Sequence, residues 1–95
     1  MSTLPPSDRI YRFQAVVERT YGPAVSHFHI LFPHSVEDEF RTRGTVRVIC
    51  RIGGQEYFRA LIPDGNGNHF LILNQEMRRT VGATLGSTVA VEVVP

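Results

Sequence analysis

Hydrophobic and polar residues alternate along most of this chain, which is the pattern of strands with one buried face. The first such run begins at Tyr11 and places Phe13 and Ala15 on the same side. Further strands are predicted at residues 25–32, on both sides of Gly53-Gly54, at residues 69–73 and at residues 88–94. We therefore expect about six strands and a fold dominated by β-structure.

A short helix is predicted between the second and third strands. Ser35 has the position of an N-cap, and Asp38 follows it at the spacing of a capping box. Arg41 and Arg43 precede Gly44, which is typical of a helix C-terminus. We expect about two turns of helix here, with the charged residues facing solvent.

A second short helix is predicted at residues 75–81, because Asn74 is a good N-cap and Gly82 a good terminator. Six strands and two short helices in one chain of this size indicate an all-β protein folded as a small barrel. We expect one β-barrel domain over residues 10–95, preceded by a flexible N-terminal tail over residues 1–9, which is rich in Ser and Pro.

The central hairpin allows two registers, which differ in where its arginines point. A two-residue turn at Gly53-Gly54 would place Val48 beside Arg59 and so put an arginine on the apolar face. A β-bulge or an odd-length loop would turn Phe58 inward instead. We expect the bulge or the odd-length loop, because a buried and unpaired Arg59 would cost several kcal/mol. The outward set is then Arg47, Arg51, Tyr57 and Arg59.

Composition excludes several classes of protein. The chain has 95 residues, 42% hydrophobic and 20% charged, which is ordinary for one globular domain. A net charge of +1 gives no general attraction to nucleic acid or membranes. No apolar run is long enough to span a membrane, and no signal peptide is recognisable, so a cytoplasmic location is expected. Cys50 is the single cysteine and is expected to be a buried structural thiol.

No set of residues has the spacing of a known catalytic or metal site. His27 and His29 share one face of a predicted strand, but a third ligand is missing, so they are interpreted as surface histidines. No nucleophile elbow and no phosphate-binding glycine loop is present. The sequence therefore predicts no enzyme activity, no catalytic residue, no bound metal and no cofactor. The best candidate surface is the outward set, because guanidinium groups beside an aromatic ring suit phosphates and stacked bases.

Spaced glycines and short motifs give the chain a resemblance to a known family. The chain resembles the domain of unknown function 1905 family of small bacterial proteins over about nine-tenths of its length, from Tyr11 onward. One departure is Ser87, where the family often has an aspartate. The matching positions are Phe32-Pro33, Ser35-Val36, Gly44, Val46-Arg47-Val48, Gly53-Gly54, Phe58, Leu61, Pro63, Gly65, Gly67, Leu73-Asn74, Met77-Arg78, Gly82 and Gly86.

The resemblance implies a double-split β-barrel, related in shape to the swapped-hairpin barrels of AbrB-type DNA binders. It also places Arg78 where the family has a basic residue, so Arg78 joins the candidate binding residues. The family has no established activity to carry over.

Two function classes follow. The first is a non-catalytic binding or interaction module that takes a small ligand or a protein partner. The alternative is an AbrB-like nucleic-acid-binding regulator that uses the arginine-rich sheet face. Salt separates them, because nucleic-acid binding weakens steeply as salt rises. No membrane partner is expected, and a monomer is favoured over a homodimer because one chain suffices to close the barrel.

Overall fold

The computed structural model describes residues 9–21 and 26–95, so residues 1–8 of the tail predicted at residues 1–9, and residues 22–25, lie outside the described residues. Within the described part, the chain forms seven strands and two short helices, and neither helix is long or apolar enough to cross a membrane. The elements are β1 (Tyr11–Val16), β2 (Glu18–Tyr21), β3 (Ser26–Leu31), α1 (Val36–Phe40), β4 (Val46–Ile52), β5 (Gln55–Pro63), β6 (His69–Leu73), α2 (Gln75–Val81) and β7 (Thr88–Val94).

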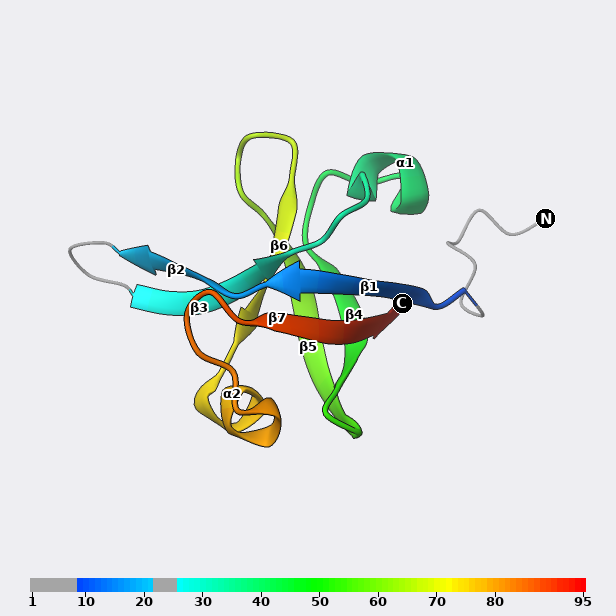
Figure 1. Cartoon of the computed structure of the whole chain (residues 1–95). Coiled ribbons are helices and arrows are strands. Elements are labelled where there is room, and N and C mark those ends of the chain that lie inside the picture. The colour runs from blue at the N-terminus through cyan, green and yellow to red at the C-terminus, as the bar shows by residue number, and fades with distance from the viewer. Residues whose placement is uncertain (1–8, 22–25) are drawn as a thin grey trace.

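All seven strands belong to one antiparallel sheet in the order β1-β7-β4-β5-β6-β3-β2, which curls into a half-barrel (Figure 1). The all-β prediction is confirmed. The two outermost strands, β1 and β2, are consecutive in the chain and are separated only by Val17. We expected one strand here, but the Val17 amide donates to the Ser87 carbonyl at 2.8 Å and ends the pairing with β7. Beyond that point the chain pairs with β3, which raises the number of strands from six to seven.

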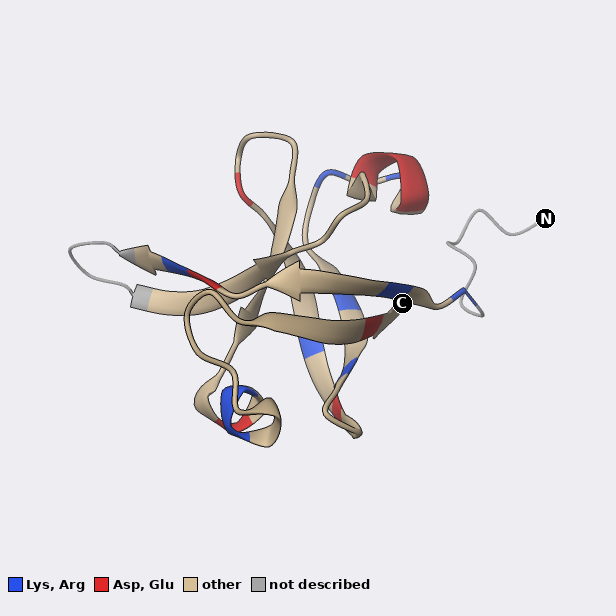
Figure 2. Ribbon diagram, in the orientation of Figure 1, with Lys and Arg blue, Asp and Glu red and all other residues tan. Residues whose placement is uncertain are grey.

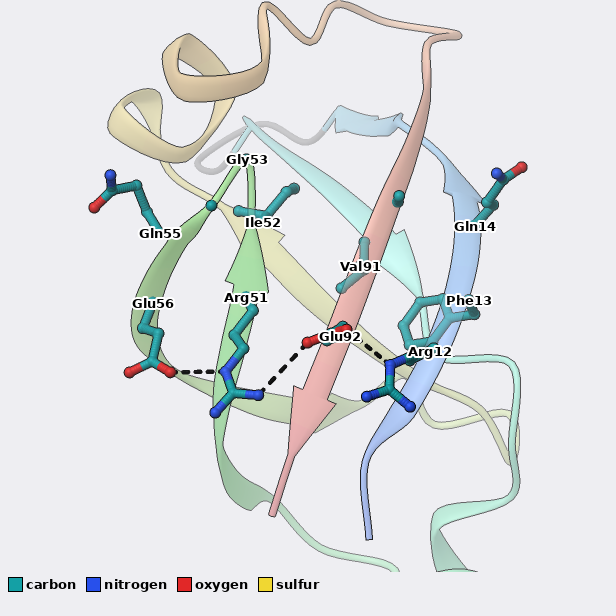
Figure 3. Close-up of a pocket in the computed structure, with 12 residues that line it drawn as sticks. Arg12, Phe13, Gln14, Arg51, Ile52, Gly53, Gln55, Glu56, Val91 and Glu92 are labelled. Atoms are coloured by element: carbon teal, nitrogen blue, oxygen red, sulfur yellow. Dashed lines mark hydrogen bonds and ion pairs between the residues drawn. The ribbon is translucent and has the colours of Figure 1, made fainter.

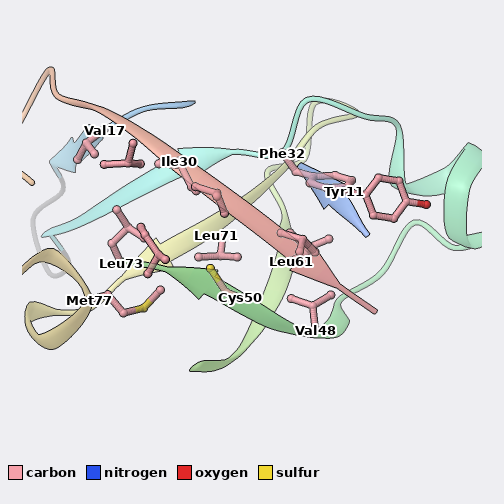
Figure 4. Close-up of a cluster of buried hydrophobic side chains, with 14 of the residues drawn as sticks. Tyr11, Val17, Ile30, Phe32, Val48, Cys50, Leu61, Leu71, Leu73 and Met77 are labelled. Carbon is pink, nitrogen blue, oxygen red and sulfur yellow. The ribbon is translucent and has the colours of Figure 1, made fainter. Parts of the chain in front are cut away.

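The core lies inside the curl and combines residues of β1, β3, β4, β5, β6 and β7 with residues of both helices (Figure 4). Val89, Val91 and Val93 point inward from β7 as predicted. Cys50 is completely buried, and this burial raises the pKa of its thiol to about 11. The cysteine is therefore a structural thiol, as the alternation predicted.

The second helix has the predicted bounds, and the first is shorter than predicted. In α2 the Asn74 side chain accepts a hydrogen bond from the Met77 amide at 2.9 Å, and Gly82 closes the helix in the left-handed conformation. α1 ends at Phe40, because Arg41 adopts a left-handed φ of 59°. Arg41 and Arg43 therefore lie beyond the helix and not in its last turn, contrary to the prediction. The capping bond from the Asp38 amide to Ser35 is present at 3.2 Å.

The predicted bulge in the central hairpin is wrong. β4 and β5 pair through a strict two-residue turn, with Ile52 opposite Gln55 and Val48 opposite Arg59. Gly53 and Gly54 both have positive φ, at 59° and 78°, which is what a type I′ turn requires.

The register places Phe58 on the outer face, where its side chain is 88% exposed, and places Arg59 on the inner face. This register is tolerated because Arg59 has a hydrogen-bond partner on the inner face. Its Nε and Nη2 groups donate to the Ile72 carbonyl of β6 at 3.2 and 3.0 Å. The cost of removing the guanidinium from water is thus offset by two charge-assisted hydrogen bonds.

Candidate functional site

Among the described residues, a cleft lies between β7 and the β4–β5 hairpin and extends over β1 (Figure 3). Its volume of about 720 Å³ is within the range of ligand-binding pockets. Apolar side chains from three strands, namely Phe13, Ile52 and Val91, contribute to its lining. The other lining residues are Arg12, Gln14, Arg51, Gly53, Gly54, Gln55, Glu56, Ala90 and Glu92.

Four charged side chains form a ladder across this cleft, one from each of four neighbouring strands (Figure 3). Arg51 Nε donates to Glu56 at 2.7 Å, and Arg51 Nη1 lies 3.5 Å from Glu92. Glu92 also accepts from Arg12 Nε at 2.8 Å. The sheet register explains the ladder, because Glu56, Arg51, Glu92 and Arg12 are directly opposite one another on successive strands.

The ladder neutralises its own charges. The hydrogen bond from Arg12, together with the contact to Arg51, holds the pKa of Glu92 below its usual value. The bond to Glu56 raises the pKa of Arg51. Two positive and two negative groups in mutual contact leave no net charge on this part of the cleft, so it does not select a charged ligand.

The structure separates the predicted arginine-rich set into two faces. Arg47 and Arg51 lie on the outer face of β4, whereas Tyr57 and Arg59 lie on the inner face of β5. Arg51 is engaged by two carboxylates, and Arg59 by a carbonyl. Arg47 and Arg59 line one shallow pocket of about 320 Å³, but the Arg59 guanidinium is directed to Ile72. Figure 2 marks both acidic and basic positions along the described strands.

Two of the predicted residues contact α2 or belong to it. The Tyr57 hydroxyl lies 2.7 Å from Oγ1 of Thr80, which attaches the hairpin to the helix. Arg78, on α2, places its guanidinium 4.1 Å from the centre of the Phe28 ring in a cation–π contact, and Arg19 lies over the same ring at 5.0 Å. Arg78 is thus engaged by the Phe28 ring.

Comparison with known proteins identifies a family. The family model described as Domain of unknown function (DUF1905) matches residues 13–93. The chain belongs to this family. No curated protein matches it.

Histidines of the DUF1905 domain pack against aromatic rings. His27 stacks on Phe70 with ring centres 5.6 Å apart, and His29 packs against both of these rings. Burial lowers the pKa of His29, against the opposing effect of nearby Glu18. Among residues 9–21 and 26–95, no three metal-ligating side chains come together.

Glu92 was not identified from the sequence as a partner in the cleft of this DUF1905 domain. The signal that points to part of the ladder is the two-residue turn, since that register alone puts Arg51 opposite Glu56. The rest of the ladder depends on β7 lying between β1 and β4, and no local pattern shows this order.

Proposed function

We propose that this DUF1905 domain is a non-catalytic binding module whose cleft between β7 and the β4–β5 hairpin takes up a ligand or a protein segment. The observation that supports this is the composition of the cleft. Among its apolar lining residues Phe13 is only half-buried, whereas Ile52 and Val91 are each 2% exposed and belong mainly to the core, and the charged groups of the cleft are already paired with one another. Such a site favours uncharged, partly apolar occupants.

The same composition supports the absence of catalysis. Among the described residues that line the cleft, none is a His, Cys, Ser, Thr, Tyr, Lys or Asp. The only titratable groups are the two arginines and two glutamates of the ladder, and each is held by an ion pair. General acid or base catalysis needs a group that is free to exchange a proton with a substrate.

A screen of uncharged fragments, followed by ¹H–¹⁵N NMR of the whole chain, tests the proposal. We expect hits to shift the amide signals of Gly53, Gly54 and Ala90. Ala90 is exposed and lines the cleft, so Ala90→Trp fills it without touching the core and should abolish binding. Thr88→Trp is the matched control, because Thr88 is exposed two residues earlier in the same strand but does not line the cleft. A screen in which every hit binds elsewhere, or in which Ala90→Trp binds as wild type does, would contradict the proposal.

Nucleic-acid binding remains the alternative, and the separation of Arg47 from Tyr57 and Arg59 weighs against it. Titration of a random-sequence DNA duplex at low and moderate salt tests it, because binding through several phosphates would weaken steeply with salt. We expect no such salt-dependent binding. The proposal includes a monomer in the cytoplasm, and sedimentation analysis tests the oligomeric state.

A further inference from the structure

The cleft begins where the backbone pairing between β4 and β7 stops. β1 pairs with β7 at six positions, from Val93 to Thr88, whereas β4 pairs with β7 only from Val94 to Glu92. In a continued register, Gly53 would lie opposite Ala90, but both residues line the cleft instead. Among the described strands, none pairs with β7 on this side between residues 88 and 91.

Two residues of this open edge turn their peptide groups toward the cleft side. In an antiparallel ladder, successive residues direct their N–H and C=O groups to opposite neighbours. The bond from the Val17 amide to the Ser87 carbonyl shows that Ser87 faces the β1 side. By alternation Val89 and Val91 also face β1, while Thr88 and Ala90 face the side from which β4 has diverged. Ala90 therefore offers an N–H and a C=O to any occupant of the cleft.

These peptide groups discriminate between kinds of occupant. An apolar small molecule lying against β7 would cover the Ala90 N–H and C=O without bonding to them, which is unfavourable. An extended peptide would bond to both, as strands do when they add to a sheet edge. Alternate side chains of such a peptide would then lie beside Ile52 and Val91, which line the cleft at the margin of the core and are each 2% exposed. The four charged side chains of the ladder already pair with one another. A peptide segment without charge therefore suits the cleft.

We infer that the cleft binds an uncharged, extended peptide segment of a partner protein, which pairs with the Ala90 edge of β7 as an added strand. This inference rests on the proposed function and names the class of occupant at the same site.

The test uses a displayed library of random linear dodecapeptides, selected against the whole chain in parallel with the fragment screen. We expect enriched peptides to be uncharged in their core and to protect the Ala90 amide from hydrogen exchange. Methylation of single peptide nitrogens should then weaken binding about fivefold or more at alternate residues, because each methyl removes one backbone hydrogen bond. Methylation at the intervening residues, whose N–H groups face away from β7, is the matched control and should change affinity by less than about twofold.

A variant of the protein gives a second measurement. Ala90→Pro removes only an N–H that no strand uses, so the sheet should tolerate it while peptide affinity falls about fivefold or more. Val16→Pro is the matched control, because by the same alternation its N–H faces away from β7, and Val16 does not line the cleft. Should Ala90→Pro not fold, the methylation series on the wild-type chain decides alone.

The two proposals fail differently. Fragments that bind the cleft while no peptide does would overturn the inference and leave the proposed function standing. Peptides that bind without sensitivity to alternate methylation would overturn it as well. If neither fragments nor peptides bind the cleft, the proposed function and the inference both fall.

Discussion

The turn at Gly53-Gly54 gives a prediction whose size follows directly from the structure. Both glycines have positive φ, so an alanine at either position has a left-handed strain of about 1–2 kcal/mol. They differ in their surroundings. A Cβ at Gly53 would lie 2.6 Å from Thr80 Cγ2 and 2.7 Å from Val81 Cγ1, whereas a Cβ at Gly54 would meet nothing within 4 Å.

The two methyl groups of α2 have little room to yield. Thr80 is β-branched, and its Oγ1 donates to the Glu76 carbonyl at 2.9 Å and lies 2.7 Å from the Tyr57 hydroxyl, so its rotamer is fixed. Overpacking of this kind costs about 1–3 kcal/mol. We therefore expect Gly53→Ala to lower the free energy of unfolding by about 2–5 kcal/mol, and Gly54→Ala by only about 1–2 kcal/mol.

Urea unfolding followed by circular dichroism measures both variants, with Gly54→Ala as the matched control. Thr80→Ser removes the nearer methyl group and keeps Oγ1, so in the Gly53→Ala background it should recover part of the loss, with a coupling of at least about 0.5 kcal/mol. Equal losses for the two glycine variants would refute the reasoning, since they would leave only the backbone strain and no steric contact with α2.

Three further predictions concern buried polar groups. Arg59→Met should lower the free energy of unfolding by about 1–3 kcal/mol, because the Ile72 carbonyl loses both donors. Arg47→Met on the exposed face is the control and should change the free energy of unfolding by less than about 0.5 kcal/mol. Urea unfolding measures both variants. Burial and the hydrogen bond to Glu39 raise the pKa of Tyr11 to about 12, so the stability that Tyr11 contributes is complete below pH 10 and is lost as the pH rises to about 12. Unfolding free energies at pH 9 and pH 11 should therefore differ more for wild type than for Tyr11→Phe, and an equal fall in both would contradict this. The Cys50 thiol, with a pKa of about 11, should react with an aromatic disulfide reagent at pH 8 only as fast as the chain opens, and reaction at the rate of a free thiol would show the burial to be wrong.

Local patterns sufficed for most elements of the fold. The helix at Gln75–Val81 follows from Asn74 and Gly82, and the strand at Thr88–Val94 from its alternating valines, because caps and alternation act over a few residues. The register of the central hairpin was beyond such reasoning. The register depended on whether Arg59 has a partner on the inner face. That partner is the Ile72 carbonyl of β6, which lies outside the β4–β5 hairpin.

The candidate site was even less accessible from the sequence. The arginine-rich set was assembled from the wrong register, so its members lie on opposite faces of the sheet. The cleft exists because β4 and β7 separate after Arg51 and Glu92, which is a property of two strands remote in the sequence. The charge ladder across it likewise combines residues from four strands, and its geometry follows from their order in the sheet.

The position of β7 has a consequence for how the chain acquires its structure. β7 lies between β1 and β4, and the contact of Arg12 with Glu92 joins residues 80 positions apart. During synthesis, β1 emerges long before β7, so it lacks this neighbour until β7 has also left the ribosome. Such long-range closure slows folding. A nascent chain stalled before Thr88 would lack a neighbour for β1 and leave both β1 and β4 open to wrong partners.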